Sequence, residues 1–253
     1  MTTKAQTNID SANWQLRALF TNLAKPTPPR LFNWDMAVHM VDSSIFIPIN
    51  YNDTLDTENF ADIYSEMRNS AYDTLPILTI DSVLSPTNFY GPDTINIMTM
   101  FYDYYRFKDD ALTTNIYFDF DTINNILTDK AIRPGYPYDI FKMFASAPNK
   151  NLASGNQVIY RFGLENLFYD NFNMLDANAY ANGIRLRANF NEGTGWHDII
   201  LGQENFIPIY YTNAGKYAIE MQVIEIVGEN EKELAHSISY TKIKKTREEN
   251  YEF

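Results

Sequence analysis

A strict alternation of apolar and polar residues over 184–190 constrains the fold more than any other feature of the sequence. Successive side chains of a β-strand point to opposite faces, so this pattern predicts a strand with one buried and one solvated face. A glycine-containing segment, 191–195, follows, and 196–201 resumes an extended pattern, which together predict a β-hairpin. The apolar positions that we expect to face a core are Ile184, Leu186, Ala188 and Phe190.

Further short strands with turn residues between them are predicted along the same part of the chain. In the strand around residues 217–226 the alternation breaks at Ile224, as it does at a β-bulge. Several short strands in close succession are typical of a β-sandwich. We expect one to occupy residues 151–253. The other predicted strands there are Val158–Phe162, Leu167–Phe172, Phe206–Tyr211 and Ile238–Ile243.

Residues 1–150 are predicted to form an irregular α+β region with an extended N-terminal arm. Asp10 or Ser11 can cap a first helix that ends near Ala24, and Asp56 or Thr57 a second that ends near Ala71. The predicted fold class is therefore mainly β, a sandwich preceded by a region with two helices. The strands expected in this region are Val41–Ile49, Ile77–Val83, Thr94–Tyr104, Asn115–Phe120 and Asp139–Phe144.

Composition excludes several classes of function. The formal net charge of −12 repels phosphate backbones, so we expect no nucleic-acid partner. The chain has no cysteine, which removes disulfides, thiol nucleophiles and thiolate metal sites. No apolar run reaches the roughly 20 residues of a membrane span, so membrane insertion is not expected. The first residues also lack the apolar stretch of a signal peptide, so an extracellular role would need a trimmed leader or a longer parent chain.

Catalytic motifs are not found in the sequence. The three histidines, His39, His197 and His236, are not spaced as a metal-binding pair, and no zinc-protease, nucleophile-elbow, P-loop or dinucleotide-binding motif occurs. We therefore expect a protein that is not an enzyme. A carbohydrate-active enzyme, or an accessory domain of one, remains an alternative, because the chain has 32 acidic residues and sequence alone does not place two of them across a cleft.

The best candidate for a cation site is a calcium site on segment 119–124. Asp119 and Asp121 would point the same way from an extended strand, and Asn124 would add an oxygen ligand. The segment lacks the glycine and the final glutamate of an EF-hand loop. Polar positions of a strand that runs into a turn explain the same residues, so we expect no obligatory cofactor.

An aromatic cluster is the best candidate for a binding surface. Tyr90, Tyr102, Tyr104 and Tyr105 could form a platform for sugars or a groove for a protein. The alternative is that these residues belong to the core and rim of a tyrosine-rich β layer.

Two segments of the C-terminal third carry a resemblance to a known family. Arg187-Ala-Asn-Phe-Asn-Glu-Gly-Thr-Gly-Trp196 and Ala214-Gly-Lys-Tyr-Ala-Ile-Glu-Met-Gln-Val223 resemble a PKD-like domain, over residues 155–245. That family has a Phe-Gly-Asp-Gly-type turn, where this chain has Asn191 and Glu192 in place of the first glycine and the aspartate. The resemblance implies an immunoglobulin-like β-sandwich that does no chemistry itself.

The upstream region is similar to N-terminal parts of large exported surface proteins of Gram-negative bacteria. The segments that carry this resemblance are 32–43, 70–74 and 108–118. It implies an extracellular module that binds, spaces or displays, with a protein or carbohydrate partner at a cell surface. A self-assembling virion or filament subunit remains an alternative, in which the arm of residues 1–60 would pack on another copy of the chain.

Overall fold

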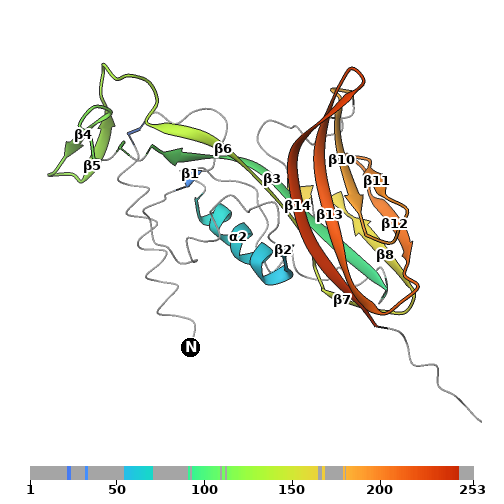
Figure 1. The fold of residues 1–253 in the computed structure, drawn as a ribbon. Helices are drawn as coiled ribbons and strands as arrows, with labels where there is room; N and C mark the ends of the chain where they lie inside the picture. The colour runs from blue at the N-terminus through green and yellow to red at the C-terminus, as the bar shows by residue number, and fades with distance from the viewer. Residues whose placement is uncertain are drawn as a thin grey trace, which may run out of the picture. The chain divides into compact units, whose positions relative to one another are not determined.

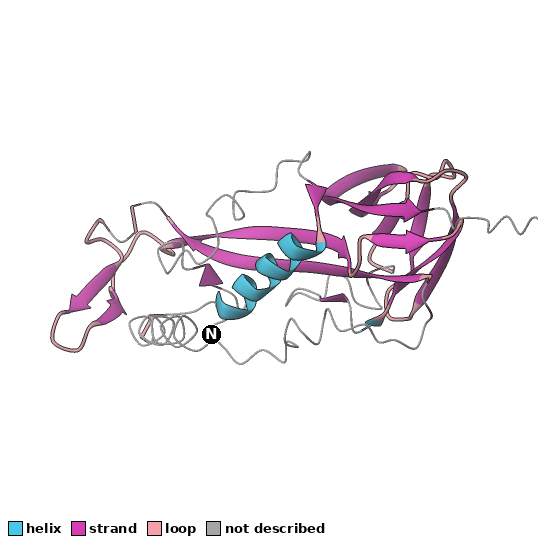
Figure 2. Ribbon diagram, turned by 90° about the horizontal axis from the view of Figure 1, so that it is seen from below, coloured by secondary structure: helices cyan, strands magenta, loops and turns pink. Residues whose placement is uncertain are grey.

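The structure is a computed structural model, and it describes residues 22–23, 32–33, 54–70, 91, 93–108, 110–111, 113–164, 167–168, 179 and 181–244. Strands dominate this part of the chain, together with one α-helix (Figures 1 and 2). The prediction of a mainly β fold is confirmed. The elements are β1 Phe32–Asn33, β2 Thr54–Leu55, α2 Thr57–Ser70, β3 Thr94–Phe107, β4 Phe118–Asp121, β5 Ile126–Asp129, β6 Tyr138–Pro148, β7 Leu152–Ser154, β8 Gln157–Phe162, β9 Leu167–Phe168, β10 Ile184–Asn189, β11 Trp196–Ile199, β12 Asn205–Tyr210, β13 Gly215–Val227 and β14 Asn230–Lys244.

The chain divides into two compact units, each assembled from separate stretches of sequence. The larger unit contains the whole of the predicted sandwich region, residues 151–253, together with earlier segments. Its stretches are Ile47–Ile63, Leu78–Tyr102 and Met143–Phe253, and those of the smaller unit are Met1–Phe46, Tyr64–Ile77 and Asp103–Lys142.

One sheet of the larger unit has the strand order β11-β10-β13-β14-β2, and β7 also pairs with β14. β10 is antiparallel to both neighbours, with Ala188 opposite His197 on one side and opposite Met221 on the other. β13 and β14 form a long antiparallel hairpin, whereas β7 and β2 run parallel to β14. The expected bulge is present as a register shift between Val223 and Ile224.

The second sheet is built around β3, β8 and β12. β8 is antiparallel to β12 and parallel to β3. The consecutive strands β12 and β13 thus lie in different sheets, although they are separated by only residues 211–214. The chain crosses between the sheets at that point instead of forming a hairpin.

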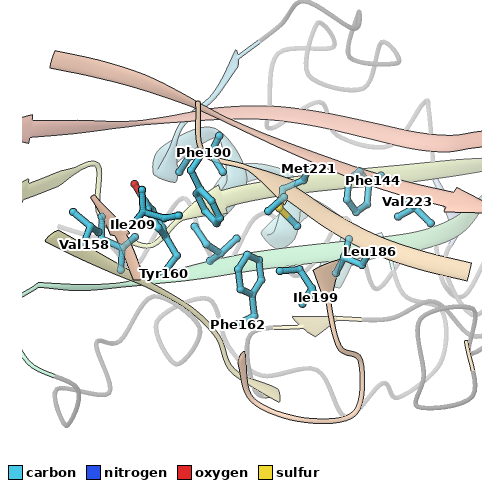
Figure 3. Close-up of a cluster of buried hydrophobic side chains, with 14 of the residues drawn as sticks. Phe144, Val158, Tyr160, Phe162, Leu186, Phe190, Ile199, Ile209, Met221 and Val223 are labelled. Atoms are coloured by element: carbon cyan, nitrogen blue, oxygen red, sulfur yellow. The ribbon is translucent and has the colours of Figure 1, made fainter. Parts of the chain in front are cut away.

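A common hydrophobic core joins side chains from both sheets (Figure 3). Tyr160 and Phe190 stack with ring centres 4.2 Å apart, and Phe162 meets Phe190 edge to face. Burial of such side chains is the main stabilising contribution in a domain of this kind, at about 1.5–3 kcal/mol for each one fully buried. The predicted inward row Ile184, Leu186, Ala188 and Phe190 is buried, as expected.

The helix prediction needs a correction, because the described residues contain one α-helix and not two. The second predicted helix is present as α2, and its N-cap is Asp56, whose Oδ1 accepts a hydrogen bond from the Asn59 amide at 2.9 Å. The first lies outside the described residues except for Asn22 and Leu23. Asn22 forms a parallel bridge with Thr128, which is a strand-type contact and not a helical one.

Most predicted strands are found, but several boundaries differ. The predicted strand Asn115–Phe120 is replaced by β4, which begins at Phe118 because residues 113–117 form turns and bends. The last strand begins at Asn230, well before the predicted Ile238, since polar residues on its solvated side hide the pattern. The predicted strands Val41–Ile49 and Ile77–Val83 lie outside the described residues. The predicted boundary between an N-terminal region, residues 1–150, and a sandwich, residues 151–253, stays a prediction.

In the smaller unit, β4 and β5 form a two-stranded antiparallel hairpin with Phe120 opposite Leu127. β1 pairs in parallel with the end of β3, at Tyr105 and Arg106. Asn125 has a φ of 53°, a left-handed conformation that asparagine tolerates in tight turns. This residue closes the turn between the two strands.

Candidate binding face

The outward side of the β11-β10-β13-β14 sheet carries charged, amide and aromatic side chains around Arg187, and we call this group the outer face. The same side of the sheet also carries the apolar residues Ile224, Ile226 and Ile238 and the exposed lysines Lys216 and Lys242. On β10 its position follows from the alternation that buries the opposite side, because Arg185 and Arg187 each lie between two core residues. The strand register places Asp198, Arg187, Gln222 and His236 directly opposite one another across four strands. The outer face consists of Arg185, Arg187, Asn189, Trp196, Asp198, Glu220, Gln222, Glu231, Glu233 and His236.

Arg187 is the centre of the contacts on the outer face. Its Nε donates to Oε1 of Gln222 at 3.1 Å, and its Nη1 donates to Oε2 of Glu231 at 2.9 Å. The guanidinium carbon also lies 4.8 Å from the centre of the Trp196 ring, within the range of a cation–π contact. The arginine is therefore held in one position from three strands.

The contacts continue from Gln222 to the far strand. Gln222 Nε2 donates to Oε2 of Glu233 at 2.6 Å, and Glu233 Oε1 lies 4.0 Å from Nδ1 of His236. The other ring nitrogen of His236 is 4.0 Å from Oε2 of Glu220. Side chains fixed by such cross-strand contacts form a surface that loses little conformational entropy when a partner covers it.

A second polar cluster lies in the turn between β10 and β11. Oε1 of Glu192 lies 2.9 Å from Nε2 of His197 and also accepts a hydrogen bond from Oγ1 of Thr194. Burial alone would raise the pKa of Glu192, but the hydrogen bonds from His197 and Thr194 outweigh it, and the pKa is lowered. This carboxylate is thus held in its charged form inside the turn.

The geometry of this cluster does not match a catalytic triad. In a triad one imidazole nitrogen meets the carboxylate and the other meets the hydroxyl. Here the same atom, Nε2 of His197, lies near both Glu192 and Thr194, at 2.9 Å and 3.0 Å. The arrangement stabilises the turn and does not activate the hydroxyl as a nucleophile.

Beneath the turn, Tyr160 and Tyr211 form a buried pair whose hydroxyl oxygens are 2.9 Å apart. The Tyr211 hydroxyl also lies 3.2 Å from the Phe190 carbonyl, to which it can donate. Burial raises the pKa of both phenols well above the ordinary value. Both hydroxyls therefore stay protonated at neutral pH and serve as hydrogen-bonding groups of the core.

The residues predicted for calcium are used in local contacts. Asp121 Oδ1 accepts from the backbone amides of Ile123 and Asn124, and its Oδ2 accepts from the Asn124 side chain at 2.7 Å. The hydrogen bonds from Asn124, and then that from Ile123, lower the pKa of Asp121. Asp119 pairs with Lys130 at 3.4 Å. The structure thus brings Asp121 and Asn124 together as a turn, and Asp119 faces a cation.

The predicted aromatic platform stays a prediction. Tyr102, Tyr104 and Tyr105 lie in β3, where the structure describes the backbone at these positions. Tyr90 and His39 lie outside the described residues.

In the part of the chain that the structure covers, no three acidic, histidine or cysteine side chains are grouped as a metal site would need. The same part contains no helix long and apolar enough to span a membrane.

Sequence reasoning missed the outer face as a site. The alternation of Arg185 and Arg187 with apolar residues indicated the solvated side of one strand, but not which residues of other strands lie beside it. Gln222 and Glu231 are 35 and 44 positions from Arg187, and only the strand register brings them together. Trp196 next to a predicted turn was the one signal available in the sequence, because tryptophan is enriched at protein interfaces.

Comparison of the chain with protein-family models, with curated protein sequences and with solved structures finds no match.

Proposed function

We propose that the C-terminal part of the chain is an immunoglobulin-like sandwich of the PKD-like kind. Sandwiches of this class place strands C, F and G in one sheet, with C′ beside C, and strands B and E in the other. The order β11-β10-β13-β14 supports this if it corresponds to C′, C, F and G. The antiparallel pair β8 and β12 would then be strands B and E.

A hydrogen bond at the start of β13 adds support. In immunoglobulin-like sandwiches a tyrosine near the start of strand F bonds back to the backbone a few residues upstream. Tyr217 does the same here, since its hydroxyl donates to the carbonyl of Asn213 at 2.8 Å. Two features differ from antibody domains. The chain has no cysteine, and its strand β10 carries no tryptophan.

A fold of this class hosts many functions, so the functional proposal rests on the outer face. We propose that the protein is a non-enzymatic module that binds a partner protein through this face in an extracellular setting. The observation that carries the proposal is the Trp196–Arg187–Gln222–Glu233 chain of contacts. Tryptophan and arginine are enriched among the residues that dominate binding energy at protein interfaces.

A protein partner fits the outer face better than a sugar. Sugar-binding platforms present an open aromatic ring face. Trp196 is 36% exposed, and the Arg187 guanidinium already lies over its ring. A sugar would have to displace this contact, whereas a flat protein surface can cover the existing network.

Photo-cross-linking tests the proposal directly. A benzophenone amino acid is placed at Asp198 or Glu231 on the outer face, and at Phe206 on β12 as a control in the other sheet, and cross-links are collected in the cells that make the protein. We expect the same discrete protein adduct from both face positions and none from Phe206. Adducts of equal yield from all three positions, or none from the face, would contradict the proposal.

The solution mass separates this proposal from the self-assembly alternative. A binding module should elute as a monomer of 29.3 kDa in size-exclusion chromatography with light scattering. A closed oligomer or a filament would favour a structural subunit and contradict the assignment.

A further inference from the structure

β12 is the last strand of its sheet in the described part of the chain, where it pairs with β8 alone. A strand at the edge of a sheet presents a row of backbone N–H and C=O groups and is a template for pairing with another chain. Residues 206–211, Phe-Ile-Pro-Ile-Tyr-Tyr, contain no charge, and uncharged apolar strands associate most readily. On the outward side of β12, Phe206 is 47% exposed and Tyr210 65% exposed. Apart from its proline, β12 therefore has the properties of a strand that self-associates.

Two backbone hydrogen bonds determine which residues of β12 face the edge. In an antiparallel pair, successive residues alternately bond to the neighbouring strand and point away from it. The Ile159 N–H donates to the Asp93 carbonyl at 3.0 Å, on the β3 side of β8, so the Ile159 backbone points away from β12. Pro208 is opposite Ile159, and its backbone therefore points away from β8. The Tyr211 N–H donates to the Asn156 carbonyl at 2.8 Å, which gives the same alternation from the other end of the pair.

The backbone groups that line the outer edge of β12 are thus those of Phe206, Pro208 and Tyr210, with Pro208 in the middle. Proline has no N–H, so a chain that paired with this edge would lose a ladder hydrogen bond at the central position. Two copies of β12 paired antiparallel about Pro208 would lose both central bonds. Inside the sheet the proline removes no hydrogen bond, because its nitrogen does not face β8.

β11 is an edge strand of the other sheet, and it differs from β12 in length and charge. Among the described residues it pairs with β10 alone, it is four residues long, and it carries the exposed Asp198. Short length and charge both limit pairing at an edge. Just beyond β11, the Asn205 side chain binds both backbone groups of Ile200, with Oδ1 accepting from the N–H at 3.0 Å and Nδ2 donating to the carbonyl at 2.8 Å. β12 has six residues and no charge, so its protection falls to Pro208.

We infer that Pro208 prevents β12 from pairing with β12 of a second copy of the chain. Replacement of this one residue should turn the edge into a site of self-association. The inference does not depend on the proposed binding face, because β12 belongs to the other sheet.

The first test compares Pro208→Thr with the unsubstituted full chain. Threonine restores the N–H and favours strands, and the side chain at this position is exposed. Size-exclusion chromatography with light scattering is run over a series of protein concentrations. The unsubstituted chain should stay at 29.3 kDa throughout, whereas the mean mass of Pro208→Thr should at least double at the highest concentration. Circular dichroism verifies that the variant is folded.

Hydrogen exchange at single amides locates the association. The Ile207 and Ile209 amides face β8 and should exchange slowly in both proteins. The Tyr210 amide points away from β8 and should exchange fast in the unsubstituted chain. In associated Pro208→Thr its exchange should become about ten-fold slower or more, because the amide enters the new ladder. Association that leaves the Tyr210 amide fast would place the contact elsewhere and overturn the inference.

The matched control is Pro134→Thr, which makes the same chemical change at an exposed proline between β5 and β6. This variant should remain monomeric over the same concentrations. A folded Pro208→Thr that is also monomeric throughout, or equal association of both variants, would overturn the inference. One outcome needs no variant. A slowly exchanging Tyr210 amide in the unsubstituted chain would show that the edge is already paired, and the role of Pro208 would be refuted.

Discussion

Tyr217 donates a hydrogen bond from its hydroxyl to the backbone carbonyl of Asn213, four residues upstream, at 2.8 Å. The bond closes the corner between β12 and β13, where the chain passes from one sheet to the other. The Tyr217 ring also lies 4.2 Å from that of Tyr211, so the corner is fixed both by packing and by a hydrogen bond.

Tyr217→Phe should destabilise the protein by about 1 kcal/mol, because it removes this hydrogen bond and keeps the ring. Urea unfolding followed by fluorescence measures the change. Tyr210→Phe is the control, since Tyr210 is 65% exposed at the end of β12. It should change the free energy of unfolding by less than about 0.5 kcal/mol. Equal effects of the two substitutions would contradict the role of the corner.

Substitution of two buried serines on β14 by alanine should have different effects on stability. Ser237 Oγ accepts a hydrogen bond from the Ser146 amide at 2.9 Å, so Ser237→Ala should destabilise by about 1–3 kcal/mol. Ser239 is fully buried and its Oγ has no hydrogen-bond partner in the described part of the chain. Ser239→Ala should therefore be neutral or stabilising. Thermal unfolding of the two variants measures both effects. A large loss of stability in Ser239→Ala would contradict the prediction, because it would mean that the Ser239 hydroxyl makes a stabilising hydrogen bond.

Glu192 should make stability depend on pH in the acid range. Its pKa is lowered in the folded state from the ordinary 4.5, so its contribution is fully present above that value. The contribution is lost as the pH falls from there through the lowered folded pKa. Glu192→Gln should reduce stability at neutral pH and flatten its decline below about pH 4.5.

The control for this pH prediction is Glu229→Gln, which removes one charge from an exposed turn. Free energies of unfolding of the three proteins are measured from neutral pH down into the acid range. If the free energy of unfolding of Glu192→Gln falls as steeply with acid as that of the unsubstituted chain, the Glu192 carboxylate is not the source of the pH dependence.

Calcium should not stabilise the fold through segment 119–124. The Asp121 oxygens accept hydrogen bonds from the turn, and Asp119 faces Lys130. A ligand that binds the folded state raises its melting temperature by mass action. We expect the same melting temperature in millimolar calcium and in chelator. A rise that Asp121→Asn abolishes would show that the turn rearranges to bind the ion.

Local patterns were enough to predict several elements. Alternation over 184–190 correctly gave the buried side of β10, because a half-buried strand imposes a period of two on its own residues. The pair of candidate caps, Asp56 and Thr57, predicted the start of α2 for a similarly local reason, and the structure selects Asp56. The break at Ile224 marked the place where the register between β13 and β14 shifts, although the extra residue there is Leu234 of β14.

The outer face could not be predicted in the same way. Its contacts join Arg187 to Gln222 and Glu231, and their proximity depends on β10 pairing with β13 and β13 with β14. The parallel pairing of β7 with β14 is likewise invisible to periodicity. The early start of β14 was missed because Glu231 and Glu233 face solvent and give no apolar signal.

Both the outer face and the immunoglobulin-like assignment depend on β10 lying between β11 and β13. Because the chain has no cysteine, introduced thiols can test this with a short cross-linker that reacts only with adjacent pairs. Asn189 of β10 and Glu220 of β13 are directly opposite in the register. Lys244 is the last residue of β14, six positions beyond Ile238, which is the residue of β14 that pairs with Glu220. The pair Asn189→Cys with Glu220→Cys should cross-link rapidly in the folded protein, and Asn189→Cys with Lys244→Cys should not. Failure of the first pair in a folded sample, or equal reaction of both, would contradict the strand order on which the account rests.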